Sequence, residues 1–333
     1  MRILLISPMV IPITPDTRYA GIETLVYQYS KELVKEHEVS VIGHSDSAYP
    51  EGVKTYLCRP RGDLFLDGEL LAYQSYQYIL RTFDVIHDFS HQHFACRYNY
   101  KLPALNIFWH APSLAQYPKA PYNIIGLSKW ACREFKRVYN QEARYMQSIV
   151  IDPETYHPVG ERGDRFLTFG VMTKEKGNLA VAMLCKELGF PLDVAGAKSD
   201  DEYEKLVKLA CDGELIKYHG EVSEEEKMRL LQTCKALIYM MPQEYEEVTS
   251  HKLQEAMFCG APVIVSNVGA VPEIVTHGVN GFLCNTEGGF KKALRDIDSL
   301  KPDFTDVIGN YSIQNVIKNY VKLYEQVTGG LHW

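Results

Sequence analysis

Length, composition and charge exclude several classes of protein. The chain has 333 residues, of which 46% are apolar, and its formal net charge is −7. A chain of this length and composition can bury two moderate cores, so we expect two domains. The negative charge argues against a nucleic-acid-binding protein, because affinity for a phosphate backbone comes from lysine and arginine.

The cysteines and the first residues predict a cytoplasmic protein. Eight cysteines form no Cys-Xaa-Xaa-Cys pair, so we expect reduced thiols in apolar surroundings. The opening MRILLISPMVIPI is interrupted by two prolines and is typical of a first strand, not of a signal peptide. No apolar run reaches the roughly 18 residues that a membrane span requires.

Strands rich in Val, Ile and Leu alternate with amphipathic stretches along the chain. This alternation predicts an α/β protein with parallel, doubly wound, Rossmann-like sheets. In the first half the expected strands are Arg2–Ser7, Glu38–Gly43, Val53–Leu57, Asp84–His87, Ala104–Trp109 and Asn123–Leu127. The expected helices there are 21–35, 67–81 and 129–139.

The same alternation restarts in the second half, after a segment rich in Pro, Gly and charge at 152–165 that we interpret as a linker. The expected strands are Phe166–Val171, Leu192–Ala195, Ile216–His219, Ala236–Met241 and Val263–Ser266, and the expected helices are 177–188, 202–211, 223–234, 250–259 and 312–327. We therefore expect domains at 1–155 and 156–311, followed by a C-terminal helical segment at 312–333.

Two glutamates separated by seven residues, Glu247 and Glu255, lie in an acidic loop and on the helix that follows it. Ser250 is predicted to cap this helix. Long side chains on a helix point toward its N-terminus, so Glu255 is expected to turn toward the opening that Glu247 overlooks. The free amides at 250–252 suit a phosphate.

The residues around this pair form a longer motif. They are Glu255-Ala256-Met257, Gly260-Ala261-Pro262, Gly269-Ala270-Val271-Pro272-Glu273 and Gly278-Val279-Asn280-Gly281. The run resembles the donor-binding signature of the retaining glycosyltransferases of family 4, which have the GT-B fold of two Rossmann-like domains facing each other across a cleft. The resemblance implies an N-terminal domain that binds the acceptor and a C-terminal domain that binds a nucleotide sugar. It also implies that the C-terminal helix, in 312–333, packs back toward the N-terminal domain. It also implies that Glu255 holds the ribose and Glu247 the donor sugar.

The segment Gly170–Gly177 resembles the family's Gly-Arg-Xaa-Xaa-Xaa-Glu-Lys-Gly segment, whose Arg and Lys neutralise the diphosphate. Lys176 falls on the Lys position, but Val171 replaces the Arg. Lys252, at the start of the predicted helix, or Lys174 is expected to supply the second positive charge. The segment Arg18–Thr24 resembles the family's Gly-Gly-Xaa-Glu loop, with Ala20 in place of the first Gly and Gly21 as the second. Small residues in this loop let backbone amides approach the donor diphosphate or the acceptor.

His110 ends a predicted strand where the family places a histidine near the reacting centre. The residues His87, Asp88, His91 and His93 also allow a metal site, although loop or acceptor-facing histidines are the simpler interpretation. Family chemistry needs no metal or other cofactor.

The stretch 129–144 is locally basic through Lys129, Arg133, Lys136, Arg137 and Arg144. It predicts either a solvated helix face or a peripheral contact with an anionic membrane, at the inner face if the protein is cytoplasmic.

The resemblance implies an enzyme, a metal-independent hexosyltransferase. It would move a hexose from a nucleotide diphosphate sugar to an acceptor hydroxyl, on a glycan, a lipid or a small molecule, with retention of configuration. Two alternatives stay open, a nucleotide-sugar 2-epimerase of the same architecture and a catalytically silent sugar-nucleotide-binding subunit. The base, the sugar and the acceptor do not follow from the sequence.

Overall fold

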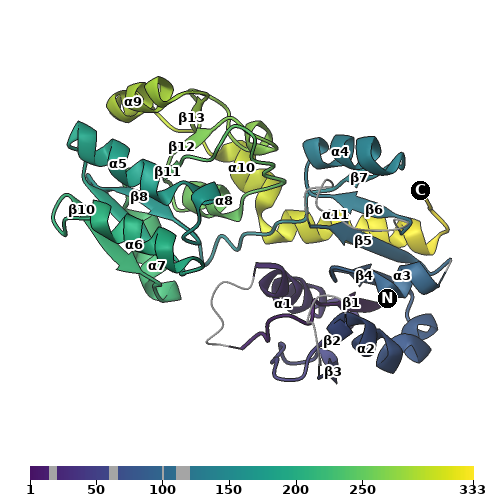
Figure 1. Ribbon diagram of the computed structural model, residues 1–333. Coiled ribbons are helices and arrows are strands. Elements are labelled where there is room, and N and C mark those ends of the chain that lie inside the picture. The colour runs from purple at the N-terminus through teal and green to yellow at the C-terminus, as the bar shows by residue number, and fades with distance from the viewer. Residues whose placement is uncertain (15–20, 60–66, 100, 110–120) are drawn as a thin grey trace. The chain divides into compact units, whose positions relative to one another are not determined.

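The computed structural model describes residues 1–14, 21–59, 67–99, 101–109 and 121–333. The chain divides into two units (Figure 1). Unit 1 comprises Met1–Val150 and Ser312–Trp333, and unit 2 comprises Ile151–Tyr311. Each unit is built on one parallel sheet, and its core is formed by the apolar side chains of the strands and of the helices that cover them.

Unit 1 contains a seven-stranded sheet in the order β3-β2-β1-β4-β5-β6-β7. Its strands are β1 (Arg2–Ile6), β2 (Glu38–His44), β3 (Lys54–Cys58), β4 (Val85–Asp88), β5 (Ala104–Phe108), β6 (Ile124–Gly126) and β7 (Arg144–Tyr145). Its helices are α1 (Gly21–Leu33), α2 (Asp67–Tyr76), α3 (Phe94–Tyr98), α4 (Lys129–Tyr139) and α11 (Ile313–Thr328), with a 3₁₀ turn at Gln77–Thr82.

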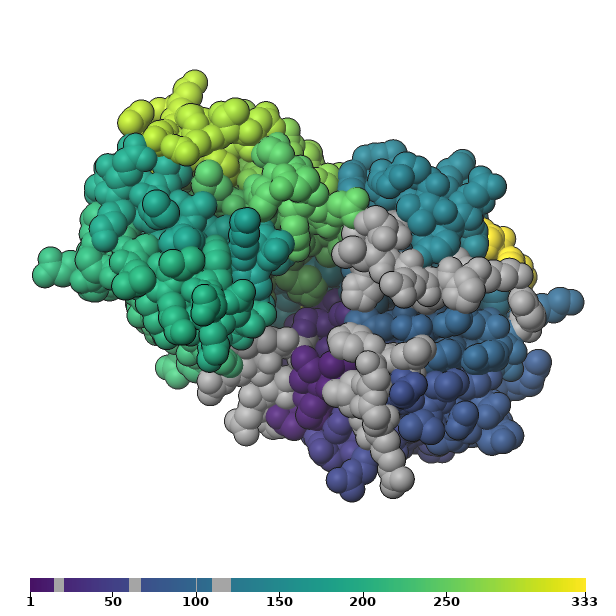
Figure 2. Space-filling view, viewed as in Figure 1, coloured from purple at the N-terminus to yellow at the C-terminus, as the bar shows by residue number. Residues whose placement is uncertain are grey.

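Unit 2 contains a six-stranded sheet in the order β10-β9-β8-β11-β12-β13. Its strands are β8 (Phe166–Phe169), β9 (Leu192–Ala195), β10 (Ile216–Gly220), β11 (Leu237–Tyr239), β12 (Val263–Ser266) and β13 (Gly281–Cys284). Its helices are α5 (Asn178–Leu188), α6 (Asp201–Ala210), α7 (Glu224–Thr233), α8 (His251–Phe258), α9 (Glu287–Asp296) and α10 (Thr305–Tyr311), with 3₁₀ turns at Lys174–Lys176, Val271–Glu273 and Ile297–Ser299. The teal helices α5 and α6 lie on the face of this unit that Figure 2 shows.

Strand order fixes where each unit can hold a ligand. Successive strands are added toward one edge of the sheet and then toward the other, and this change occurs between β1 and β4 in unit 1 and between β8 and β11 in unit 2. In doubly wound sheets the loops diverge at this point and leave a crevice at the carboxyl ends of the strands. The expected doubly wound α/β class is confirmed in both units, and the β8/β11 reversal is the natural ligand position in unit 2.

Helix α11 is anchored in unit 1 by buried polar contacts. The hydroxyl of Tyr324 lies 2.7 Å from Nδ1 of His87, and the hydroxyl of Tyr320 lies 2.6 Å from Oγ of Ser148. The imidazole of His87 also stacks on Tyr320 with ring centroids 4.7 Å apart. His87 is therefore a core residue that ties the last helix to β4.

The segment 152–165, which we interpreted as a linker, packs on unit 2. Its residue Arg162 donates to three carbonyl oxygens, those of Cys234 at 2.7 Å and of Leu231 and Cys259 at 2.8 Å. These carbonyls lie at the C-terminal ends of α7 and α8, where a positive charge is favourable. One guanidinium thus joins the ends of two helices.

Replacing Arg162 with methionine is expected to lower the free energy of unfolding of unit 2 by about 2–4 kcal/mol, because three charge-assisted hydrogen bonds are lost together. Urea unfolding followed by circular dichroism measures the change. Arg295→Met on the exposed side of α9 is the matched control. Equal stability of the two variants would show that the Arg162 contacts contribute nothing.

Candidate functional site

Charged side chains from three parts of unit 2 meet at the carboxyl ends of β8 and β11. Lys176 follows β8 and ends the 3₁₀ turn at Lys174–Lys176, while Glu247 lies in the loop after β11. Helix α8 begins directly after this loop and contributes Lys252 and Glu255. The strand order changes direction between β8 and β11, so the sheet itself positions the group.

Lys176 is the best-held cation of this group. Its Nζ donates to the hydroxyl of Tyr245 at 2.6 Å and to Oε2 of Glu247 at 3.3 Å, and it faces the ring of Tyr239. Burial alone would lower the pKa of Lys176, but the charge of Glu247 and the two tyrosines outweigh it and raise this pKa. Lys176 is therefore a fixed positive charge.

Lys252 lies beside this pair and is only partly exposed. Its amine packs so closely against Gly170 that a Cβ at that position would overlap it, and it lies 5.0 Å from the centre of the Tyr239 ring. Burial, together with the nearby charge of Lys176, lowers the pKa of Lys252 to about 8. The amine therefore lies against Gly170, the residue before Val171, and the family resemblance leads us to expect an arginine at position 171.

The carboxylate of Glu247 is buried between these cations. Burial raises its pKa, and the charges of Lys176 and Lys252 hold the rise back. The backbone of Glu247 is fixed as well, since its carbonyl accepts the N–H of Ala270 at 2.8 Å. Gly269, with φ +52°, makes this approach possible because a Cβ there would overlap the Glu247 backbone. Lys176 pairs directly with this carboxylate, and Lys252 lies close enough to interact with it electrostatically. Two amines beside one buried carboxylate are an arrangement suited to an anion.

Glu255 belongs to a second polar group on the same helix. Its Oε1 accepts the hydroxyl of Tyr156 at 2.8 Å and lies 3.5 Å from Nζ of Lys227. Sequence reasoning missed both partners, because Tyr156 lies in the segment interpreted as a linker and Lys227 belongs to no motif.

Comparison with known proteins finds a family model that matches the second unit. Residues 157–312 match the model described as glycosyl transferases group 1. The match covers nearly all of unit 2 and, within unit 1, only Ser312.

A curated relative is similar over a shorter segment of the chain. Human alpha-1,3/1,6-mannosyltransferase ALG2 is 30% identical over 86 residues, which cover 26% of this chain and 20% of that protein. The matched segments span less than half the length of the curated relatives that the chain matches.

Solved structures resemble this chain along almost its full length. Sucrose-phosphate synthase from Thermosynechococcus elongatus has a TM-score of 0.79 at 16% identity, covering 99% of this chain and 100% of that one. Anabaena HepE in complex with UDP-glucose has a TM-score of 0.71 at 14% identity, covering 98% and 100%. At these identities the similarity shows the fold, which is that of the GT-B glycosyltransferases.

Ser250 occupies the N-cap position of α8 in unit 2, but its side chain makes no capping hydrogen bond. The predicted capping role is therefore wrong, although the helix begins where expected. The backbone at Ser250 is extended, with φ −141° and ψ 98°, and no hydroxyl bond satisfies the first-turn amides. Such amides suit an anionic ligand.

Three predicted site residues remain, namely Lys174, Gly21 and His110. Lys174 is exposed and makes none of the contacts described above. Gly21 is the first residue of α1 in unit 1, and a Cβ there would meet nothing within 4 Å. His110 lies outside the described residues.

Two of the residues considered for a metal site, His87 and Asp88, make other contacts. His87 bonds to Tyr324 inside the core, and Asp88 accepts the N–H of Ser90 at 2.9 Å and its hydroxyl at 2.6 Å. Among the described residues, no group of three or more His, Cys, Asp or Glu side chains is placed to hold a metal ion. The described side chains at 87–93 therefore do not form a cluster of metal ligands.

The basic stretch 129–144 is largely engaged within unit 1. Lys136 pairs with Glu142, Arg137 pairs with Glu134, and the guanidinium of Arg144 lies 4.3 Å from the centre of the Trp333 ring. The apolar side of α4, formed by Ala131 and Phe135, is buried in the core. No helix in the described ranges has the length and apolar character needed to cross a membrane.

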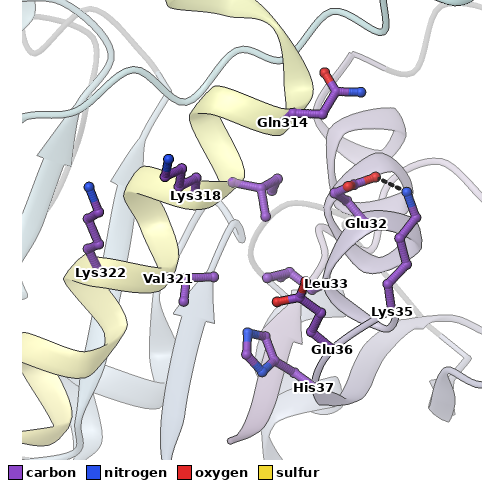
Figure 3. Close-up of a pocket in the computed structure, with 10 residues that line it drawn as sticks. Glu32, Leu33, Lys35, Glu36, His37, Gln314, Lys318, Val321 and Lys322 are labelled. Atoms are coloured by element: carbon purple, nitrogen blue, oxygen red, sulfur yellow. Dashed lines mark hydrogen bonds and ion pairs between the residues drawn. The ribbon is translucent and has the colours of Figure 1, made fainter.

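A cavity of about 340 Å³ lies between the C-terminal end of α1 and α11 in unit 1 (Figure 3). Its lining includes the apolar side chains of Leu33, Ile317 and Val321 and the ion pair of Glu32 with Lys35. This lining does not contain any of the predicted site residues.

Proposed function

We propose that this chain is a retaining, metal-independent glycosyltransferase that moves a hexose from a nucleotide diphosphate sugar to an acceptor hydroxyl. The observation that carries the proposal is the meeting of Lys176, Lys252 and Glu247 beside the N-terminus of α8, at the strand reversal of unit 2. Similarity to HepE, whose structure contains UDP-glucose, supports a nucleotide sugar as donor.

Each group has a chemical role in this proposal. Lys176 and Lys252 neutralise the departing diphosphate together with the first-turn amides of α8, so that no metal ion is needed. Glu247 accepts the hydroxyls of the donor sugar, and Glu255 accepts those of the ribose. His110 positions the sugar near the acceptor. We further propose that 156–311 binds the donor, that 1–155 binds the acceptor, and that 312–333 completes the first domain.

Two other functions fit the same architecture. A nucleotide-sugar 2-epimerase would release free epimer without an acceptor, and a silent subunit would bind the nucleotide without turnover. The position of Lys252 beside Gly170 favours the transferase over the silent subunit. Its amine supplies the second positive charge, which an arginine at position 171 would otherwise provide.

The roles of the two glutamates are tested by Glu255→Ala and Glu247→Ala. Glu255→Ala is expected to weaken nucleoside diphosphate binding by about 1.5–3 kcal/mol, because a hydrogen bond to a charged acceptor is lost. Glu247→Ala is expected to keep the nucleotide affinity and to lower turnover. Calorimetric titration with UDP, GDP and ADP, followed by transfer assays, measures both. Equal loss of nucleotide affinity in the two variants would contradict this division.

Location and membrane contact are separate parts of the proposal. All eight cysteines are free, as a reducing cytoplasmic compartment allows. A peripheral contact through 129–144 would be electrostatic, because the apolar side of α4 is already buried. Sedimentation with anionic vesicles at low and high salt distinguishes this contact from a solvated helix face.

A further inference from the structure

We propose that Tyr156 and Lys227 are positioning residues that hold one carboxylate oxygen of Glu255, so that the other oxygen faces the hydroxyls of a nucleotide ribose. This assignment rests on the proposed function, in which Glu255 binds the ribose.

The contacts of Tyr156 and Lys227 converge on a single atom. The hydroxyl of Tyr156 donates to Oε1 of Glu255 at 2.8 Å, and Nζ of Lys227 donates to that hydroxyl at 3.1 Å while lying 3.5 Å from the same Oε1. Within the described residues, Oε2 of Glu255 has no hydrogen bond of this kind. The carboxylate is therefore held on one side and open on the other.

Burial makes this arrangement more than a surface ion pair. The side chains of Lys227 and Glu255 are each 12% exposed, and Tyr156 is 9% exposed. Exposed pairs contribute little because water and salt screen them, whereas partly buried charges orient one another strongly. Lys227 also pairs with Glu224 at 2.6 Å, which fixes its amine from the solvent side.

The protonation states suit these roles. Burial would lower the pKa of Lys227, but the charges of Glu255 and Glu224 and the contact with Tyr156 outweigh it and raise this pKa. Burial is also the main reason why the pKa of Tyr156 is raised. Lys227 thus stays positively charged, and Tyr156 keeps the proton that it donates to Glu255.

Three separate elements supply the three side chains. Tyr156 comes from the segment before β8, Lys227 from α7 and Glu255 from α8. A glutamate on an exposed helix turn samples several rotamers, and a ligand must bear the cost of selecting one. Here the two neighbouring elements make that selection before the ligand arrives, which is what a ribose-binding carboxylate needs.

The test compares ligands with and without ribose hydroxyls. Wild-type protein, Lys227→Met, Tyr156→Phe and Lys227→Arg are titrated with UDP, GDP and ADP and with their 2′,3′-dideoxy forms. Lys205→Met, on the exposed surface of α6, is the matched control. Thermal unfolding of each variant establishes that it is folded, and Tyr156→Phe removes a single hydroxyl if Lys227→Met proves unstable.

In the wild-type protein, removal of the ribose hydroxyls is expected to weaken binding about ten- to a hundredfold. Lys227→Met is expected to weaken binding of the ribose form about five- to tenfold and to leave binding of the dideoxy form unchanged. Tyr156→Phe should act in the same direction, and Lys227→Arg should recover part of the affinity. A merely structural role would weaken both ligands equally.

Either of two results would overturn this assignment and leave the proposed function standing. They are unchanged ribose-form affinity in both Lys227→Met and Tyr156→Phe, and equal losses for the ribose and dideoxy forms. In either case the wild type still binds nucleotide and the proposed function stands. A wild-type protein that binds none of the nucleotides, or that binds both forms equally well, would instead overturn the role of Glu255 and this assignment with it.

Discussion

Replacing Lys176 with methionine is expected to lower the rate of sugar transfer about a hundred- to a thousandfold, the scale seen when one preorganised electrostatic group is removed from a transition state. In the proposed reaction, negative charge develops on the diphosphate as the glycosidic bond breaks. Tyr245 and Glu247 hold the Lys176 amine in place, and its raised pKa keeps it protonated across the neutral range.

Steady-state kinetics of Lys176→Met measure this effect, with Lys292→Met on the exposed surface of α9 as the matched control. We expect the loss mainly in kcat, because the charge on the leaving group is greatest in the transition state. A Lys176→Met enzyme that transfers sugar at the wild-type rate would remove Lys176 from the mechanism.

Replacing Lys252 with methionine is expected to lower transfer about tenfold or more, and by at least as much as Lys174→Met, because only the Lys252 amine is packed within the cluster. Adding Val171→Arg should restore part of the lost rate, since it returns a cation next to the same position. A wild-type rate in Lys252→Met would show that the second charge is not used.

The lowered pKa of Lys252 predicts a second difference between the wild-type protein and Lys252→Met, in the pH dependence of diphosphate binding. In the free protein the amine loses its proton as the pH rises through about 8. A bound diphosphate favours the protonated form, so binding above pH 8 should take up close to one proton and weaken by up to about tenfold per pH unit. Calorimetry in buffers of different ionisation enthalpy measures the uptake, which Lys252→Met should abolish.

The stability of Lys252→Met separates this effect from misfolding. The pKa of Lys252 is lower in the folded protein than in the unfolded chain, so between these two pKa values the unfolded chain binds more protons. At neutral pH Lys252 is charged in both states, and burying this charge lowers the free energy of unfolding. Lys252→Met should therefore be at least as stable as the wild type at pH 7. A marked loss of stability would contradict this electrostatic account.

The sequence predicted the architecture because hydrophobic runs in a parallel sheet are local signals. Two short strands were not predicted, because their sequences contain no long apolar run. Strand β7 has two residues, and β13 begins at the last glycine of a turn. The helix α9 lies in a stretch that we described only as a late helical region.

Within the site, the predictable part was the part that belongs to a motif. Glu247, Glu255 and Lys176 come from the resemblance, and the contact of Lys252 with Gly170 is consistent with the expectation that Lys252 supplies the second positive charge. Tyr156 and Lys227 could not be found in this way, because the packing of a segment and a helix far apart in the sequence brings them to Glu255. The lost capping bond of Ser250 likewise depends on local backbone angles that a sequence pattern does not specify.

The most direct test of the central claim is to follow the reaction by NMR with UDP-glucose, GDP-mannose and related donors, in the presence of EDTA and of simple acceptors. We predict transfer that survives EDTA and a first product with the same anomeric configuration as the donor. A product of inverted configuration, release of a 2-epimer without acceptor, or activity that disappears in EDTA and returns with manganese or magnesium would contradict the proposed function.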